Sequence, residues 1–396
     1  MQLNKIKQYI KKHLPIVAQI YKHYESSQKI VNYFSTNYKK NALLSYTTYP
    51  FKKGQCLSHT NYYEAMSWAK ILNKTGYNVD VIHYDYSSKI NFSKYSVLIG
   101  FGDAFQKYFE SGFNHVKTIY YGTGMHVCHQ NHVTLKRIKD VYLKRGKWLC
   151  CSARFVEKTW THQTFLVDAI IALGNEICKE SYSKFYDGPI YSLPAPFFKV
   201  LDAHEILSQG HKNNIKGFLW FGSSGLIHKG LDLVLEVFAN HPKIKLHICG
   251  PIKNELDFEK VYFKELYQLP NIITHGFVDI SSQLFKEILQ DCAFVISPSC
   301  SEGGCTGTLT AIGNGALIPI ITKETTISTG FEIWINDLSV KDVEKAIDKA
   351  LKLTENETLE LRKRNLEYVL KYHSQENYYK ELENAIIEIL EVKNEL

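Results

Sequence analysis

Glu302 lies in a glycine-bearing segment of the sequence in which a sugar phosphate could bind. The apolar run 293–296 before it has the length and residue types of a buried parallel strand, and residues 308–315 after it are expected to form a short helix. The N–H groups and the dipole at the start of a helix attract anions, and glycines let a ligand approach closely. A carboxylate beside such a site can bind hydroxyl groups, so the segment predicts a site for a phosphate that carries a sugar.

A second glycine- and serine-rich segment, residues 222–230, follows the apolar run 217–221 and precedes an amphipathic helix. Lys229 within it provides a mobile positive charge suited to a diphosphate. The glycine spacing matches neither a Walker nor a dinucleotide-binding motif, which weighs against an ATPase or a dehydrogenase. An isolated Glu-Gly-Gly is more often a surface turn, but the surrounding pattern of strands and helices favours a site.

Glu302-Gly303, followed by the turn 311–315 and an apolar run, resembles the donor-site motif of family 4 glycosyltransferases. The resemblance implies an α/β fold with two Rossmann-like domains facing a central cleft (GT-B), and a retaining, metal-independent transfer from a nucleotide-diphosphate sugar. It also implies that Glu302 is catalytic, binding the sugar hydroxyls, while Lys229 and backbone amides stabilise the leaving diphosphate. The family's motif has a second glutamate where this chain has Thr310. In that family the second glutamate holds the ribose of the nucleotide, so three outcomes are open here: a different ribose contact, which we expect, weaker donor binding, or an inactive copy.

In the resembled family an arginine and a lysine hold the pyrophosphate. Lys229 matches the lysine, but Ser223 stands at the arginine position, so the second cation is missing or supplied elsewhere, with His228 as a candidate. The corner 276–278 resembles the family's base-binding corner, where backbone groups read the base, so the base cannot be predicted. The expected donor-binding residues are Gly222, Ser223, Ser224, His228, Lys229, Gly276, Phe277, Val278, Gly303, Gly304, Cys305, Thr306 and Thr310.

Two histidines, His126 and His129, follow the apolar run 116–121 in a glycine-bearing loop. Family 4 enzymes often keep a histidine near the donor sugar after the corresponding strand, and the resemblance makes His126 the second expected catalytic residue. A metal pair is an alternative, although helical zinc ligands usually lie at i and i+4 near an acid. Ordinary loop structure is the other alternative.

The loop 51–61 follows the first expected strand, at the edge where doubly wound sheets bind ligands. In the resembled family this loop lies beside the acceptor. Asn61 and Glu64 have the character of the N-cap and N3 residues of the next helix. Arg154 is expected to begin a helix and to reach the cleft. The expected acceptor-side residues are Gly54, Thr60, Asn61 and Arg154.

A chain of 396 residues predicts two domains. Alternating strands and helices, including an expected strand at 148–151, predict parallel sheets with helices on both faces. The expected organisation is a basic helical arm over 1–40, an acceptor domain over 41–200, a donor domain over 212–370, and a helix over 371–396. The resemblance implies that this last helix packs back toward the first domain.

The formal charge of +7 comes from the arm, because residues 1–40 contain eight lysines and one acid while the remaining residues balance at 39 basic and 39 acidic. Apolar residues at helical spacing, interrupted by Pro15, make the arm amphipathic. It is expected either to lie on an anionic membrane surface or to pack on the protein. No nucleic-acid partner is expected.

The nine cysteines form no CxxC pair, which argues against a disulfide framework and a zinc site. No signal peptide and no apolar run approaching ~18 residues is evident. We expect a cytoplasmic protein, which is peripheral on the inner face of the plasma membrane if the arm lies on lipid and free of the membrane if the arm packs on the protein.

The expected function is transfer of a sugar from a nucleotide-diphosphate sugar to a glycan or lipid-linked acceptor, with no cofactor or metal. The abundance of Lys, Tyr, Asn and Ile suggests an AT-rich bacterial genome, which associates the chain with surface polysaccharide, in lipopolysaccharide or capsule. The alternatives are a non-catalytic nucleotide- or glycan-binding subunit of an envelope-assembly complex and a nucleotide-sugar epimerase.

Overall fold

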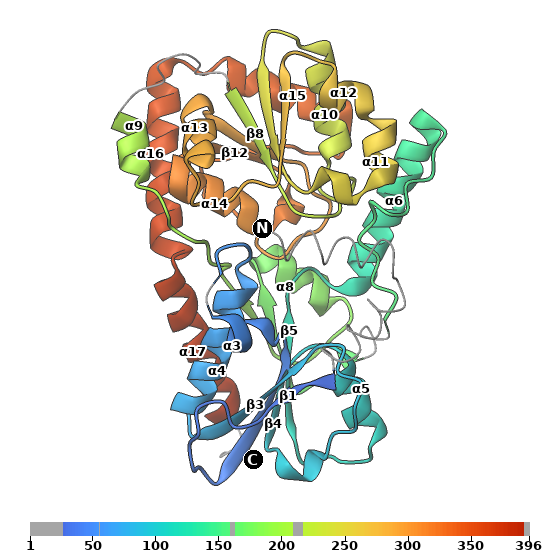
Figure 1. The fold of residues 1–396 in the computed structure, drawn as a ribbon, viewed down its shortest axis with the longest axis vertical. Helices are drawn as coiled ribbons and strands as arrows, with labels where there is room; N and C mark the ends of the chain where they lie inside the picture. Colours follow the sequence, from blue (N-terminus) through green and yellow to red (C-terminus); the bar gives the residue numbers. More distant parts are fainter. Residues whose placement is uncertain (1–26, 55, 159–162, 209–216, 392–396) are drawn as a thin grey trace.

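The computed structural model describes residues 27–54, 56–158, 163–208 and 217–391. Most of the predicted basic arm therefore lies outside the described residues. The described chain forms two α/β halves, one above the other in Figure 1, each built on a mainly parallel sheet. This confirms the predicted fold class of two Rossmann-like units.

The first sheet has seven strands in the order β1-β3-β2-β4-β5-β6-β7, all parallel except β1. Its inner strands are continuous apolar runs because helices cover both faces, as in Ala169–Leu173, where every residue is buried. The strands are β1 (Lys29–Ile30), β2 (Lys40–Tyr46), β3 (Tyr77–His83), β4 (Val97–Gly100), β5 (Lys117–Gly122), β6 (Ala169–Leu173) and β7 (Ile190–Leu193). The helices of this part of the chain are α3 (Tyr49–Lys53), α4 (Asn61–Lys74), α5 (Asp103–Glu110), α6 (Val127–Arg145) and α8 (Glu176–Ser183), and α9 (Ala203–Ser208) lies on the connection to the second half.

The second sheet has six parallel strands in the order β10-β9-β8-β11-β12-β13. Its strands are β8 (Gly217–Phe221), β9 (Lys245–Cys249), β10 (Ile272–Gly276), β11 (Phe294–Ser297), β12 (Ile318–Ile321) and β13 (Ile333–Trp334). Its helices are α10 (Leu231–Asn240), α11 (Leu256–Val261), α12 (Phe263–Tyr267), α13 (Gln283–Asp291), α14 (Thr306–Gly315), α15 (Val340–Leu351) and α16 (Glu355–Tyr372).

Both sheets reverse their strand order at a central strand. β2 lies between β3 and β4, and β8 lies between β9 and β11. Ligands of such sheets bind outside the carboxyl ends of the strands at this point. β2 ends at Tyr46 and β8 ends at Phe221, and both residues line one cavity. The two sheets therefore direct their ligand-binding edges at a shared cleft.

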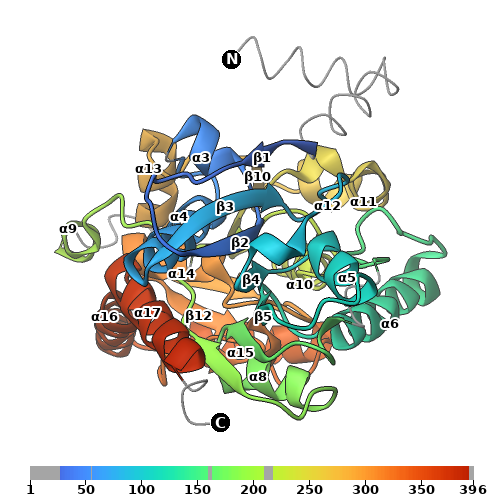
Figure 2. The ribbon, with the colours of Figure 1, turned by 90° about the horizontal axis from the view of Figure 1, so that it is seen from below.

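The last helix, α17 (Gln375–Glu391), returns to the first half (Figures 1 and 2). The carbonyl of Gln375 accepts a hydrogen bond from Tyr63 at 2.7 Å, and Glu383 pairs with Lys74 at 2.6 Å. α16 meanwhile packs on the second half, where Arg362 donates to the carbonyls of Gly315 and Ala316. The chain thus crosses from one half to the other between α16 and α17.

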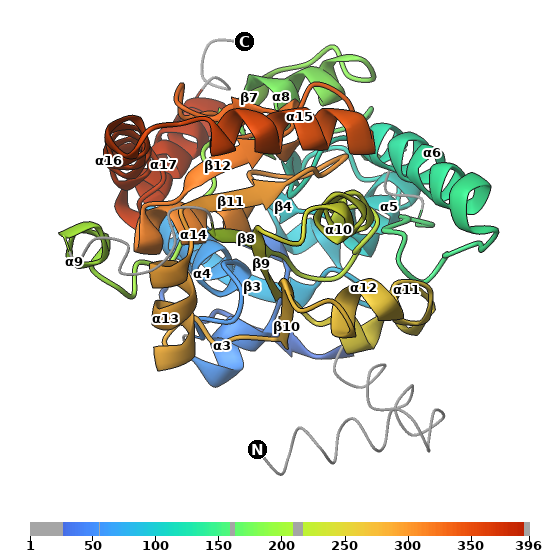
Figure 3. The ribbon, with the colours of Figure 1, turned by 90° about the horizontal axis from the view of Figure 1, so that it is seen from above.

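Helix α6 follows a strand of the first sheet but packs into the second half. Its side chains Ile138 and Val141 belong to the same buried cluster as Phe218 and Trp220 of β8. Figure 3 shows α6 at the outer side of the second half, beyond α10. The first half therefore contributes a helical arm to the core of the second.

The expected strand 148–151 does not form. Leu149 is buried in the core of the second half, and the Asp257 carboxylate accepts hydrogen bonds at 2.9 Å from the N–H of Cys151 and from the Ser152 hydroxyl. The helix expected to begin at Arg154 is also absent from 154–158. These contacts to the second half replace the pairing that a strand of the first sheet would have made.

Candidate active site

A cavity of about 850 Å³ lies between the carboxyl edges of the two sheets. The first half lines it with the start of α4 and the residues that follow β2. The second half lines it with the residues that follow β8 and β11 and with the start of α14. A volume of this size accommodates a ligand the size of a nucleotide sugar.

Glu302 lies in this cavity as a buried carboxylate between two cations. One of its oxygens pairs with the Lys229 ammonium group and accepts a hydrogen bond from Ser299 Oγ at 2.8 Å. The other lies 3.6 Å from Nη1 of Arg154. Burial opposes ionisation, but the charges of Lys229 and Arg154 outweigh it and lower the pKa of Glu302 to about 2. The site therefore holds a fixed negative charge at every physiological pH.

The segment after Glu302 presents a helix N-terminus to the cavity. Cys305 has φ of 24°, a left-handed conformation that strains a non-glycine residue, and α14 begins at the next residue. Thr306 and Gly307 line the cavity, and no described residue accepts a hydrogen bond from their N–H groups. Gly307 packs closely on β8, since a Cβ there would lie 2.6 Å from the carbonyl oxygen of Phe221. This helix start can bind an anion.

The turn 222–230 already holds a carboxylate of the protein. Glu255 accepts hydrogen bonds from the N–H groups of Gly225 and Leu226 at 2.5 and 2.9 Å. These amides are therefore not available to a ligand phosphate. Gly222, Ser223 and Lys229 line the cavity, so the part of the turn that is open to a ligand is its two ends.

His228 does not replace the arginine expected at position 223. Its side chain is fully buried, with Nδ1 2.9 Å from the Thr134 hydroxyl of α6 and Nε2 hydrogen-bonded to the carbonyl of Ser301. Burial, together with the charge of Arg154, lowers its pKa to about 3, so the ring is neutral. His228 therefore ties α6 to the Glu302 loop and does not line the cavity.

His126 does not reach the cleft either. It is the N-cap of α6, where Nδ1 accepts a hydrogen bond from the N–H of Cys128 at 3.2 Å. Its ring is fully buried, stacks on Phe185 with centroids 4.2 Å apart, and contacts the Thr164 hydroxyl at 3.1 Å. Burial and the nearby His129 lower its pKa to about 4. The capping role accounts for a histidine at this position, and His126 is not retained as a catalytic residue.

The cavity brings together most of the other residues expected from the sequence. Four of the expected residues do not line the cavity: Gly54, Ser224, Gly276 and Gly304. Gly54 is the C-cap of α3, and the N–H of Gly304 donates to the hydroxyl of Thr326. Those that do line it are Thr60, Asn61, Arg154, Gly222, Ser223, Lys229, Phe277, Val278, Glu302, Gly303, Cys305, Thr306 and Thr310.

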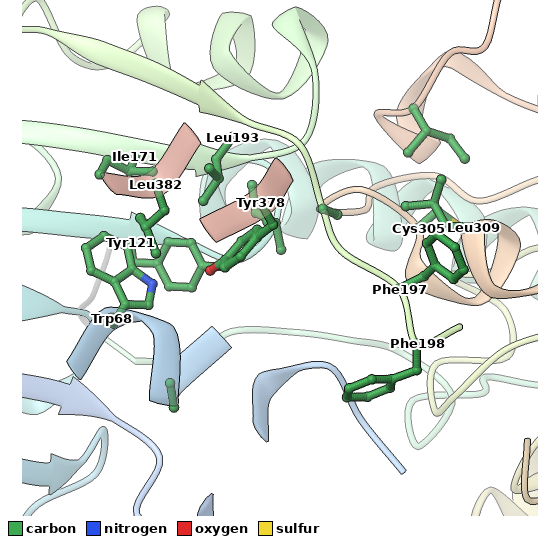
Figure 4. Close-up of a cluster of buried hydrophobic side chains, with 14 of the residues drawn as sticks. Trp68, Tyr121, Ile171, Leu193, Phe197, Phe198, Cys305, Leu309, Tyr378 and Leu382 are labelled. Atoms are coloured by element: carbon green, nitrogen blue, oxygen red, sulfur yellow. The ribbon is translucent and has the colours of Figure 1, made fainter. Parts of the chain in front are cut away.

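Glu64 lines the cavity in a way that the sequence analysis missed. It was expected to be the N3 residue behind an Asn61 N-cap, but the N-cap of α4 is Thr60, and Oε2 of Glu64 accepts hydrogen bonds from the phenols of Tyr46 and Tyr121, each at 2.8 Å. The Tyr121 hydroxyl also lies 3.2 Å from that of Tyr378 on α17, and Figure 4 shows Tyr121 between Trp68 and Tyr378. Among the described residues none donates to Oε1 of Glu64. The sequence did contain an indication that Glu64 faces inward: it precedes Trp68 by four residues, so both side chains lie on the apolar face of α4.

In the described part of the chain, no group of three or more His, Cys, Asp or Glu side chains is placed to hold a metal ion. None of the helices in the described ranges is both long enough and apolar enough to cross a membrane.

Residues 204–372 match the family model described as glycosyl transferases group 1. No curated protein sequence matches the chain. The match covers the helix α9 and nearly all of the second half, including Lys229, Glu302 and the start of α14.

Solved structures show the same fold over most of the chain. Anabaena Alr3699/HepE in complex with UDP and glucose is 11% identical, with a TM-score of 0.56 over 88% of this chain and 99% of that one. A glycosyltransferase from Rickettsia africae ESF-5 is 13% identical, with a TM-score of 0.54 over 89% of this chain and 100% of that one. The lipopolysaccharide outer core galactosyltransferase WaaB is 11% identical, with a TM-score of 0.53 over 88% of this chain and 99% of that one. At these identities the likeness establishes the two-domain GT-B fold.

Proposed function

We propose that the chain, whose residues 204–372 match the model of glycosyl transferases group 1, is a retaining glycosyltransferase that transfers a sugar from a nucleotide-diphosphate sugar to a hydroxyl-bearing glycan or lipid-linked acceptor. The observation that carries the proposal is the buried Glu302–Lys229 pair beside the start of α14. It places a carboxylate, a cation and unpaired amides around one part of the cavity.

In the proposed reaction the diphosphate of the donor lies between Lys229 and the first turn of α14. Lys229 and the N–H groups of Thr306 and Gly307 stabilise the charge that develops on the leaving diphosphate. Donors that are already positioned in a cleft of this kind contribute about 3–4 kcal/mol each to lowering the barrier. These groups replace a metal ion in that role. Glu302 accepts hydrogen bonds from the sugar hydroxyls and so positions the anomeric carbon, and the acceptor attacks from the side of the leaving group.

The acceptor enters from the first half. There the cavity is lined by Thr60, Asn61 and the carboxylate of Glu64, with aromatic side chains such as Tyr84 and Phe101 beside them. Aromatic rings with hydrogen-bonding groups between them suit a sugar ring. We assign the acceptor to the glycans or lipid-linked glycans of a bacterial surface, and the arm 1–40 to contact with an anionic membrane.

A thermal-shift titration of the full chain tests the donor proposal. UDP, GDP, dTDP and ADP and their common sugar conjugates are added with and without EDTA. We expect the melting temperature to rise with one nucleotide and its conjugates, and to rise equally in EDTA. UDP is the first candidate because the Anabaena protein was solved with UDP and glucose. A response that is lost in EDTA would overturn the metal-independent mechanism, and no response at all would overturn the donor site.

A second candidate function, nucleotide or glycan binding without catalysis, is favoured by Thr310. Its hydroxyl donates to the carbonyl of Thr306 at 2.7 Å, and it offers no carboxylate to a ribose. Release of free sugar and nucleoside diphosphate from the donor, measured without any acceptor, separates the two functions. A transferase hydrolyses its donor slowly, whereas a binding subunit leaves it intact.

A further inference from the structure

Arg154 belongs to the first half by sequence and to the second half by packing. It follows α6, whose buried side chains lie in the core of the second half. Several contacts fix this connection to the second half. Arg137 pairs with Asp232 of α10 at 2.5 Å, Thr134 contacts His228, and Ser152 donates to Asp257.

The segment that carries Arg154 is also held to the start of α6. The side-chain amide of Asn131 makes two hydrogen bonds with the backbone of Val156, at 2.9 and 3.0 Å, and Gln130 donates to the carbonyl of Arg154 at 2.6 Å. The backbone at Arg154 is thus fixed from both directions. Its side chain is presented to the cavity from a defined position.

The Arg154 side chain lies across the turn at Gly225. A Cβ at Gly225 would come within 2.4 Å of Cδ and 2.5 Å of Cγ of Arg154, and φ there is +91°. Glycine is therefore required twice, for the backbone conformation and for the space that the arginine stem occupies. Beyond the turn, the guanidinium lines the cavity 3.6 Å from Glu302 and remains 42% exposed.

The charges around Glu302 explain what this guanidinium can bind. Of the described residues that line the cavity, Arg154 and Lys229 are the lysine and arginine side chains. Lys229 and Glu302 together have no net charge, so without Arg154 the pair would attract an anion weakly. The N–H groups of Gly225 and Leu226 are already bonded to Glu255, and position 223 is a serine. A donor diphosphate therefore needs a second cation.

We infer that Arg154 binds the diphosphate of the donor together with Lys229, supplying from the α6 arm the cation that is absent at Ser223. This inference rests on the proposed function and reassigns a residue that the sequence analysis placed on the acceptor side. A planar guanidinium can make two parallel hydrogen bonds to phosphate oxygens. The guanidinium of Arg154 lies 3.6 Å from Glu302, which is longer than a hydrogen bond, so its N–H groups can turn to a ligand.

The test measures binding of inorganic pyrophosphate, the four nucleoside diphosphates and the matching free nucleosides to the full chain by calorimetry. Arg154→Gln is compared with Arg154→Lys and with the control Lys158→Gln. Lys158 is an exposed lysine four residues away that pairs with Asp103 at 3.1 Å. We expect Arg154→Gln to weaken diphosphate binding about 10- to 100-fold, as loss of a charged hydrogen bond does, with nucleoside binding unchanged. Lys158→Gln should bind diphosphates like the wild type. The affinity of Arg154→Lys should lie between those of the wild type and Arg154→Gln.

A rescue variant makes the result specific to the missing cation. Arg154→Gln combined with Ser223→Arg should recover at least part of the lost affinity, because it returns a guanidinium to the open end of the turn. Equal diphosphate affinity in the wild type and in Arg154→Gln would overturn this inference and leave the proposed function standing. A wild-type protein that binds none of the diphosphates would overturn both. A parallel loss of nucleoside binding in Arg154→Gln would show a structural role and also overturn the inference.

Discussion

Arg137 of α6 and Asp232 of α10 form an ion pair at 2.5 Å in which each side chain is only 2% exposed. The pair joins a helix that follows a strand of the first sheet to a helix of the second half. A buried charge that loses its partner costs much more than the pair contributes. The contact between α6 and the second half therefore depends on both residues being present or both being replaced.

Replacing one member of this pair should destabilise the protein strongly. We expect Arg137→Met or Asp232→Leu alone to lower the free energy of unfolding of the second half by about 3–5 kcal/mol. The double replacement should recover most of that loss, because it leaves no unpaired charge. Urea denaturation followed by tryptophan fluorescence measures this, since Trp220 lies in the same buried cluster as α6. Additive losses in the double variant would contradict the coupling.

Replacing Glu302 by Gln should lower turnover strongly while leaving nucleotide binding intact. The amide keeps the shape of the side chain but loses the charge that holds Lys229 and that, in the proposed reaction, binds the sugar hydroxyls. We expect donor hydrolysis to fall by about 10²–10³-fold, the loss typical of removing one positioned catalytic group. Ser299→Ala, which removes the 2.8 Å hydrogen bond to Glu302 and the longer one to the carbonyl of His228 but keeps the carboxylate, is the milder control, with about a tenfold loss. Full activity in Glu302→Gln would move the active site elsewhere.

Replacing Glu64 should lower transfer to the acceptor without lowering hydrolysis of the donor. Because Oε1 of Glu64 has no described donor and the residue lines the cavity, we expect it to accept a hydrogen bond from an acceptor hydroxyl. Glu64→Gln should keep donor hydrolysis and lower the ratio of transfer to hydrolysis about tenfold, measured with a panel of alkyl and aryl glycosides. Tyr84→Phe, which retains the ring, is the matched control. An equal loss of hydrolysis and transfer would assign Glu64 to the fold alone.

Thr310 allows a gain-of-affinity experiment. Thr310→Glu restores the carboxylate of the resembled motif at a position that lines the cavity, and a hydrogen bond to a charged group contributes about 1.5–3 kcal/mol. We expect nucleoside diphosphates to bind about tenfold more tightly. Thr310→Val should bind like the wild type, because the threonine hydroxyl is already bonded to the carbonyl of Thr306. If valine weakens binding, Thr310 itself contacts the ribose.

Three buried histidines should make the protein sensitive to mild acid. Burial lowers the pKa of His126 and of His373 to about 4 and that of His228 to about 3, whereas an unfolded histidine has a pKa of about 6.5. The folded state therefore binds fewer protons than the unfolded state below pH ~6.5. The stability due to these neutral rings is complete above that pH and is lost as the pH falls toward 4. Glu302, whose pKa is lowered from about 4.5 to about 2, adds its own loss of stability only as the pH falls below ~5.

A melting series from pH 8 to pH 4.5 measures the effect. The wild type should lose stability steadily below pH 6.5. His126→Asn is the informative variant, because asparagine also caps a helix N-terminus but does not titrate. Its melting temperature should fall less steeply with decreasing pH. A wild-type melting temperature that is equal at pH 7 and pH 5 would contradict the prediction.

The sequence predicted what depends on local pattern. Apolar runs followed by glycines located most of the strands and the two glycine-bearing segments, so Glu302, Lys229 and the start of α14, which line one cavity, were expected at the carboxyl ends of strands. The roles of residues that depend on contacts with distant parts of the chain could not be predicted from the sequence. His126 and His228 have the residue type of a catalytic group, but burial against other elements makes them structural. The sequence placed Arg154 on the acceptor side, because only the packing of α6 on the second half brings it beside Glu302.

The docking of α6 also determines where the molecule can bend. If the cleft opens to admit a donor, residues 127–156 must travel with the second half, since their buried contacts lie there. The chain must then bend wherever it passes between the halves, which is at residues 123–126 between β5 and α6, before β6, between β7 and α9, and between α16 and α17. Arg154 and Lys229 would keep their separation throughout such a motion. In the open state the two cations proposed to bind the diphosphate would already be in place. Closure would then move only the acceptor side, which belongs to the first half, toward the donor.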